Sequence, residues 1–248
     1  STTHEEYIIK AAKQGKHIFC EKPIGSDISK IKEALRVVDS SGVKLQIGFV
    51  RRFDHNHKKV HDTVVAGKIG KPHLVKITSR DPKVQPIEYL RTSGGLFFDM
   101  TIHDFDMARY LSNSDVEEVF VHAGVLIDPA IAEINDFDTA IVTMKFKNGM
   151  LGVIENCREA AYGYDQRTEV HGSEGCVMAD NDQPNTSKLL TANGILSETF
   201  LWFFVERYKE AFAAEVKAFV DVIATNSEPL VTGIDGLKAV LIARAADE

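Results

Sequence analysis

The sequence is poor in cysteine, and the three cysteines present do not indicate a disulfide framework. Cys20, Cys157 and Cys176 are odd in number and form no C-x-x-C pair, which also argues against a cysteine-based zinc site. We therefore expect a protein of a reducing compartment, the cytoplasm.

Long hydrophobic runs and an excess of positive charge are missing as well. No segment approaches the ~20 apolar residues that cross a membrane, and the longest notable run covers only residues 200–205. The formal net charge is −7, and the lysines are dispersed along the chain. We expect neither a membrane nor a nucleic acid as a partner.

The chain also has no initiator methionine, no secretory signal pattern and no G-x-G-x-x-G motif. A helix pattern is already formed at residues 5–14. We therefore expect the 248 residues to be part of a longer chain whose N-terminal segment precedes Ser1.

What is present is ordinary globular composition, with 44% hydrophobic and 26% charged residues. Apolar periodicity predicts helices at residues 4–14, 28–40 and 56–66, and short strands at residues 17–20 and 45–50. The alternation of helix and strand without a hairpin signal predicts half of a doubly wound α/β sheet. Ligands bind outside the carboxyl ends of the strands in such sheets.

The pattern changes after Gly70. Short strand patterns follow at residues 73–79, 116–125, 139–146, 151–156, 167–171, 176–179 and 188–191, with a hairpin signal at Asn148-Gly149. They predict a large, open, mostly antiparallel sheet. Two helices, over residues 203–225 and after Thr232, should lie on one face. The predicted fold class is α/β plus α+β, with domains at residues 1–70 and 71–248.

A candidate reaction centre lies between Gly94 and Asp106. A helix should begin near Leu96, after a glycine pair. At ~100° per residue, Asp99, His103 and Asp106 would lie within an arc of roughly 60°. Carboxylates beside an imidazole favour its charged form and fix its orientation, which suits proton transfer. A salt-bridged histidine on an ordinary helix is the alternative.

Lys22 follows an apolar strand and precedes Pro23. Most lysines are solvated surface charges, but a lysine at the carboxyl end of a central strand lies where ligands bind. Its ammonium could donate to a substrate hydroxyl and stabilise a developing alkoxide. Pro23 permits a cis peptide bond, which would aim Lys22 into a cleft.

Residues 156–167 are dense in hydrogen-bonding side chains, among them Asn156, Tyr162, Tyr164 and Asp165. Exposed turn chemistry would explain such a segment. A polyol substrate would need the same supply of donors and acceptors.

A metal site has to be weighed because His55, His57 and His61 give H-x-H and H-x-x-x-H spacings. No H-E-x-x-H glutamate is present, and Lys58 and Lys59 lie between the candidate ligands. Their positive charge opposes a bound cation, so we expect a solvated helix face and no metal.

With these residues in place, nearly the whole chain resembles the family of glucose-fructose oxidoreductase and inositol dehydrogenase. The E-K-P at residues 21–23 resembles that family's signature after a strand. The G-G…D-x-x-x-H at residues 94–103 and the T-G-x-D-G at residues 232–236 resemble its other two motifs. Each motif is weak alone, whereas three in the right order are specific. Residues 156–167, with Asp106 after His103, are most similar to the inositol 2-dehydrogenase branch.

The resemblance implies an N-terminal Rossmann domain for NAD(P), of which residues 1–70 would be the C-terminal remnant. Residues 71–248 would form a domain for substrate binding and oligomerisation. The implied reaction is oxidation of a secondary hydroxyl of a cyclic polyol, with myo-inositol as the expected substrate. Lys22 and Asp99 would hold the reacting hydroxyl, and His103 would be the general base.

The remaining contacts are implied in the same way. Those to the cofactor would come from Glu21, Lys22, Pro23 and Arg51. Those to the substrate would come from Arg51, Asp106, Asn156, Tyr162, Tyr164 and Asp165.

The family's glycine motif and its ribose-binding acidic residue have no counterpart in this sequence. The resemblance implies NAD or NADP as the cofactor, with NAD favoured, and the residue that discriminates the two is not in this sequence. We expect these residues alone to be inactive. Two alternatives remain open. One is another sugar or dihydrodiol dehydrogenase of the family, and the other is a non-catalytic sugar-sensing protein on the same fold.

The large sheet lacks obvious helices to cover one of its faces. That face should expose Val119, Val121, Ile141 and Val153, and contiguous apolar patches beyond roughly a few hundred Å² usually mark an interface. The resemblance points the same way, to a homo-oligomer (dimer or tetramer) that packs through the open sheet.

Overall fold

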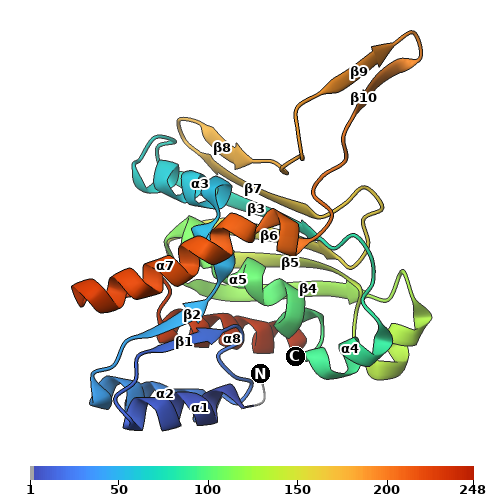
Figure 1. Ribbon diagram of the computed structural model, residues 1–248. Coiled ribbons are helices and arrows are strands. Elements are labelled where there is room, and N and C mark those ends of the chain that lie inside the picture. Colours follow the sequence, from blue (N-terminus) through green and yellow to red (C-terminus); the bar gives the residue numbers. More distant parts are fainter. Residues whose placement is uncertain (1–2) are drawn as a thin grey trace.

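The computed structural model describes residues 3–248 and begins with a small parallel sheet (Figure 1). Strands β1 (Ile18–Glu21) and β2 (Leu45–Gly48) pair in parallel, and helices α1 (His4–Lys13) and α2 (Ile28–Ser41) pack against each other beside them. The predicted order of helix, strand, helix and strand is confirmed. Both strands end at the same edge of the sheet, because Glu21 is paired with Gly48.

The ends of α2 follow from the residues that flank it. The Asp27 carboxylate accepts hydrogen bonds from the backbone N–H groups of Ser29 and Lys30, as expected of an N-cap. Gly42 ends the helix with a φ of 67°, a left-handed conformation that glycine adopts without strain. Local sequence therefore determines both boundaries.

The second sheet has six strands in the order β4-β5-β6-β3-β7-β8. Their bounds are β3 (Pro72–Arg80), β4 (Val116–Gly124), β5 (Thr139–Phe146), β6 (Leu151–Cys157), β7 (Asp165–Gly172) and β8 (Cys176–Ala179). Neighbours in this sheet are antiparallel except β3 and β6, which run parallel. The predicted mostly antiparallel sheet is confirmed, with one parallel pair that joins strands far apart in the sequence.

Residues 188–197 lie outside this sheet. Strands β9 (Lys188–Thr191) and β10 (Gly194–Ser197) form a separate two-stranded hairpin that projects from the body of the molecule (Figure 1). The prediction that residues 188–191 belong to the large sheet is wrong. Every residue of both strands is exposed, so the apolar side chains here have no core to pack against.

Helices cover the inner face of the six-stranded sheet. Helix α3 (His55–Val65) packs on β7 and β8, α5 (Ile102–Ser112) on β3, and α8 (Gly233–Asp247) on β4. The helix predicted over residues 203–225 is interrupted at the buried Tyr208, which separates α6 (Phe204–Arg207) from α7 (Lys209–Thr225). The sequence did not indicate the short helix α4 (Ile87–Ser93).

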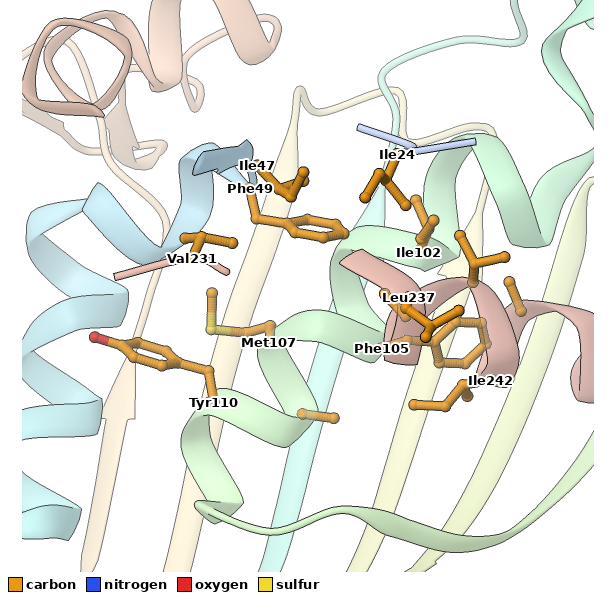
Figure 2. Packing of buried hydrophobic residues seen from close by; sticks show 14 of the residues in the cluster. Ile24, Ile47, Phe49, Ile102, Phe105, Met107, Tyr110, Val231, Leu237 and Ile242 are labelled. Carbon is orange, nitrogen blue, oxygen red and sulfur yellow. The ribbon is translucent and has the colours of Figure 1, made fainter. Parts of the chain in front are cut away.

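One large apolar cluster joins the first 70 residues to the rest of the chain. Figure 2 shows Leu237 and Ile242 of α8 beside Phe105 of α5, with Ile24 and Ile47 of the N-terminal part nearby. The division into domains at residues 1–70 and 71–248 stays a prediction, because the core is continuous across it.

Two glycines of the T-G-x-D-G motif allow α8 to approach the small parallel sheet. A Cβ on Gly233 would lie 2.3 Å from Cδ2 of Leu35, and one on Gly236 would lie 3.2 Å from the Ile24 side chain. Thr232 and Asp235 cap the helix reciprocally, in a capping box. The motif therefore serves packing and helix capping in this fold.

The outer face of the six-stranded sheet is exposed. Ile141 is 50% and Phe120 61% exposed, and Phe120 pairs with Thr143, two residues from Ile141 on the same face. Val119 and Val121 pack against the core instead, so the prediction that they lie on the exposed face is wrong. Alternate residues of a strand point to opposite faces, and only the pairing of β4 with β5 decides which set faces outward.

Glu215 of α7 is fully buried, and both of its carboxylate oxygens lack a hydrogen-bond partner in the described residues. Burial raises its pKa to about 8, and the charge of Glu21 adds to the rise. The side chain is therefore mostly protonated at neutral pH.

Glu215→Gln should stabilise the protein at pH 8 and leave its stability nearly unchanged at pH 5. Between the ordinary pKa of 4.5 and the folded value of about 8, the unfolded chain has lost this proton while the folded chain keeps it. Wild-type stability therefore falls as the pH rises through that window. At about 1.4 kcal/mol per pKa unit, the gain from glutamine should reach a few kcal/mol.

Urea unfolding at pH 5 and pH 8 measures this difference. Glu210→Gln is the matched control, because Glu210 lies exposed on the same helix. The same pH dependence in wild type and Glu215→Gln would contradict the expectation.

Candidate active site

A cavity of about 490 Å³ lies at the carboxyl ends of β1 and β2, within the ~300–1,000 Å³ typical of small-molecule sites. The position is the one expected for a ligand site in a doubly wound sheet. Residues predicted from the sequence that line it are Glu21, Lys22, Arg51, Asp99, His103 and Tyr164.

Lys22 enters the cavity directly after β1, and the peptide bond to Pro23 is cis, as predicted. Its ammonium donates to the backbone carbonyl of Asp99 and lies 3.7 Å from Oδ1 of the same residue. Burial lowers the pKa of Lys22, while the Asp99 carboxylate opposes that shift. The sequence therefore predicted correctly that this lysine lies in a cleft beside Asp99.

Asp99 lies on a π-helical turn, η2 (Phe97–Thr101), which precedes α5. Regular α-helix was predicted from Leu96 onward; the structure instead has the wider turn that is often found at functional sites. The Asp99 carboxylate accepts hydrogen bonds from the Tyr89 hydroxyl at 2.8 Å and from Nη1 of Arg158 at 3.4 Å.

His103 lies near the start of α5, with its ring edge-on to Phe49. Burial lowers the pKa of the imidazole well below its ordinary value, and the charges of Lys22 and Arg51 lower it further. The expectation that flanking carboxylates favour the charged form is therefore wrong. A neutral imidazole at pH 7 is able to accept a proton.

Asp106 does not line the cavity. Its carboxylate is buried and accepts hydrogen bonds from Nε and Nη2 of Arg52, at 2.9 and 2.6 Å. Three residues after His103, it is rotated roughly 60° around the helix, which is enough to reach a different partner. The structure thus places Asp106 in an ion pair away from the predicted substrate contact.

Arg51 lines the cavity from η1 (Val50–Phe53), the 3₁₀ turn after β2. Its Nη1 lies 2.5 Å from Oδ1 of Asp104, and Nη2 donates to the hydroxyl of Ser79. Asn156 donates to the other Asp104 oxygen at 2.8 Å and is fully buried. Asn156 therefore holds Asp104, the partner of Arg51, and does not itself line the cavity.

Tyr162 and Asp165 also lie outside the cavity lining. The buried Asp165 carboxylate accepts hydrogen bonds from Tyr162, Arg167 and Asn181. The donors and acceptors of this segment that were predicted to bind a polyol are therefore largely bonded to one another and to other protein groups.

The polar residues of the lining that were not found from the sequence are Asp81, Gln85, Tyr89 and Tyr208. Burial raises the pKa of Asp81 to about 6. Asp81 directly follows β3, so a search for polar residues at strand ends would have found it. Tyr208 arrives from the distant C-terminal helices, and no local pattern marks it.

The histidines weighed as metal ligands have other surroundings. His57 is buried, not solvated as expected, and burial lowers its pKa to about 3. Asp54, His55 and Asp182 place ligand atoms within 4.8 Å of one another. Arg207 already pairs with both carboxylates, however, and its charge takes the place that a cation would fill.

Comparison with known proteins decides the family. A model of the oxidoreductase family with an NAD-binding Rossmann fold matches residues 1–49, and a model of the GFO/IDH/MocA C-terminal domain matches residues 57–178. The chain belongs to the GFO/IDH/MocA oxidoreductase family. The resemblance inferred from its motifs is thereby confirmed, as is the predicted fold class.

Individual relatives cover almost the whole chain. The oxidoreductase YrbE of Bacillus subtilis is 50% identical over 100% of the chain and 73% of its own length. The myo-inositol 2-dehydrogenase of Thermotoga maritima is 47% identical over 99% of the chain and 74% of its own length. The crystal structure of Lactobacillus casei scyllo-inositol dehydrogenase with bound NAD(H) and scyllo-inositol superposes with a TM-score of 0.92. It is 32% identical and covers 99% of this chain and 74% of that one.

In the part of the chain that the structure describes, no helix has the length and apolar character that a membrane crossing requires.

Proposed function

We propose that this GFO/IDH/MocA oxidoreductase uses NAD to oxidise a secondary hydroxyl of a cyclic polyol, with myo-inositol as its substrate. The observation that carries the proposal is the meeting of Lys22, Asp99 and His103 in one cavity at the ends of β1 and β2. The names of the relatives described above support the substrate class.

The residues of the cavity fit the nicotinamide end of the cofactor. Glu21 and Lys22 lie at the end of β1, and apolar side chains such as Met100 and Phe203 line the same cavity, which suits an aromatic ring next to a polyol. When bound, NAD supplies the acceptor for the hydride that leaves the substrate carbon. No G-x-G-x-x-G motif occurs in this sequence, so the fit concerns the nicotinamide end of the cofactor alone.

In the proposed mechanism, His103 accepts the proton of the reacting hydroxyl. Its lowered pKa keeps the imidazole neutral and ready to do so at pH 7. The Lys22 ammonium donates to the same hydroxyl oxygen and stabilises the negative charge that develops there. Asp99 holds the ammonium in place and orients the hydroxyl, while Arg51 and Tyr164 contact the other hydroxyl groups.

The sensing alternative has less support from the same cavity. A binding protein needs donors and acceptors for a sugar, but it needs no neutral buried histidine beside a buried lysine. The presence of both groups favours catalysis. We also propose that the enzyme is cytoplasmic, in keeping with its three free cysteines.

NADH formation by the intact enzyme, with a complete nucleotide-binding domain, tests the proposal. Absorbance is followed with myo-inositol, scyllo-inositol and glucose, each with NAD and with NADP. We expect the highest kcat/KM for myo-inositol with NAD. Binding of inositol without any turnover would favour a sensor, and a preference for glucose would favour another sugar dehydrogenase.

We further propose that the outer face of the six-stranded sheet joins copies of this chain into a dimer or tetramer. Exposed apolar side chains are spread over neighbouring strands there, including Phe120, Ile141 and Leu151, with Val153 half-buried among them. Lys145 and Glu155 lie on the same face, each paired with one of these apolar residues, and add polar groups to it.

Ile141→Glu should convert the oligomer into a monomer, because it places a charge in the apolar part of this face, next to Glu155. Light scattering at micromolar concentration measures the mass of both proteins. Val65→Glu is the control, since Val65 is also exposed but lies on α3, away from the outer face. A monomeric wild type would contradict the proposal.

A further inference from the structure

Arg158 is a buried arginine beside the reacting groups to which the mechanism above gives no part. It follows directly after β6 and is 1% exposed. Its Nη1 lies 3.4 Å from Oδ2 of Asp99, its Nη2 lies 3.4 Å from Oδ2 of Asp136, and its Nε donates to the Phe137 carbonyl. The rigid planar fork of a guanidinium thus spans two carboxylates that belong to different segments.

Asp136 holds the start of the turn that carries Asp99. Its Oδ1 accepts a hydrogen bond from the backbone N–H of Leu96 at 2.7 Å. A Cβ on Gly95, where φ is +85°, would lie only 3.2 Å from the same oxygen. These contacts therefore hold η2 at two points. Asp136 holds the backbone at Leu96, just before the turn, and Arg158 holds the side chain of Asp99.

The two oxygens of Asp99 have different neighbours. Oδ1 faces Lys22 and the Tyr89 hydroxyl, whereas Oδ2 faces Arg158. Without the guanidinium, Asp99 and Asp136 would lose the cation that separates them. No other described contact holds Oδ2 of Asp99. Asp81 belongs to the same group of charges, since Arg158 is the main influence that opposes the rise of its pKa.

We propose that Arg158 is a positioning residue of the reaction, which holds the Asp99 carboxylate so that its other oxygen faces Lys22 and the reacting hydroxyl. Arg158 does not line the cavity itself, so it acts through Asp99. This inference rests on the proposed function, in which Asp99 orients the site.

A double-mutant cycle in the intact enzyme tests the proposal, with Arg158→Met, Asp99→Asn and the double variant. Arg158→Met should lower kcat for myo-inositol by ~10–100-fold, because a displacement of about 1 Å at a reacting group can cost ~10² in rate. KM for NAD should change little. The double variant should be no slower than the slower single variant, since residues that act as a unit are strongly non-additive.

Three further variants separate positioning from folding. Arg158→Lys keeps the charge without the fork and should recover only part of kcat. Arg109→Met is the control, because it removes an arginine paired with Asp115 and Asp235 outside the cavity. If Arg158→Met does not fold by circular dichroism, Asp136→Asn replaces it in the cycle, and a smaller loss of kcat that vanishes in the Asp99→Asn background is expected.

The outcomes distinguish this inference from the proposed function. Losses of Arg158→Met and Asp99→Asn that multiply, or full kcat in Arg158→Met, would overturn the positioning role while the wild-type enzyme still oxidises inositol. Failure of the wild-type enzyme to oxidise any polyol would instead overturn the proposed function, and with it the inference.

Discussion

His103→Ala in the intact enzyme should lower kcat for myo-inositol by ~10²–10⁴, the usual contribution of a general base. The variant removes the neutral imidazole that faces the cavity and leaves Lys22 and Asp99 in their mutual contact. The affinity for NADH should change little, because the loss concerns proton transfer and not cofactor binding. Steady-state kinetics and fluorescence titration with NADH measure the two quantities.

The pH profile provides a second readout for His103. Since the pKa of the imidazole is lowered well below 6.5, the base stays unprotonated as the pH falls through 6.5, and the histidine should cause no loss of kcat there. His73→Ala is the matched control, because His73 is exposed at the start of β3 and away from the cavity. Full activity of His103→Ala would refute the assignment of the base.

Lys22→Met should lower kcat/KM for the polyol by ~10²–10³, the range found when one donor to a developing oxyanion is removed. The ammonium is held against Asp99 inside the cavity, where low polarity strengthens its effect on a developing negative charge. Methionine keeps the apolar stem of the side chain, so the fold should be retained. Kinetics together with a thermal unfolding curve separate lost chemistry from lost structure.

Lys16→Met serves as the control for this variant, since Lys16 is exposed on the loop before β1. Lys22→Arg should restore little activity, because a guanidinium is larger and cannot reproduce the single-point contact with the Asp99 carbonyl. Unchanged kcat/KM in Lys22→Met would rule out a role in stabilising the alkoxide.

Local sequence determined those features of the site that depend on interactions between neighbouring residues along the chain. Apolar periodicity determined the order of elements in the first 70 residues, and Asp27 and Gly42 determined the two ends of α2. Chain position placed Lys22 at a strand end, and helical spacing placed Asp99 near His103. The cis bond before Pro23 was also foreseen, because proline is the residue that permits it.

Tertiary structure alone decided which partners those residues have. Asp106 has the spacing of a site residue, yet it pairs with Arg52, which is 54 residues away. Val119 and Val121 turn inward because β5 sets the register of β4, and Tyr208 reaches the cavity from the other end of the chain. Periodicity shows which face of a helix or strand a residue lies on. Which group that residue contacts depends on packing between segments distant in sequence. That packing also keeps His103 neutral, since burial and the charges of Lys22 and Arg51 all lower the pKa of its imidazole.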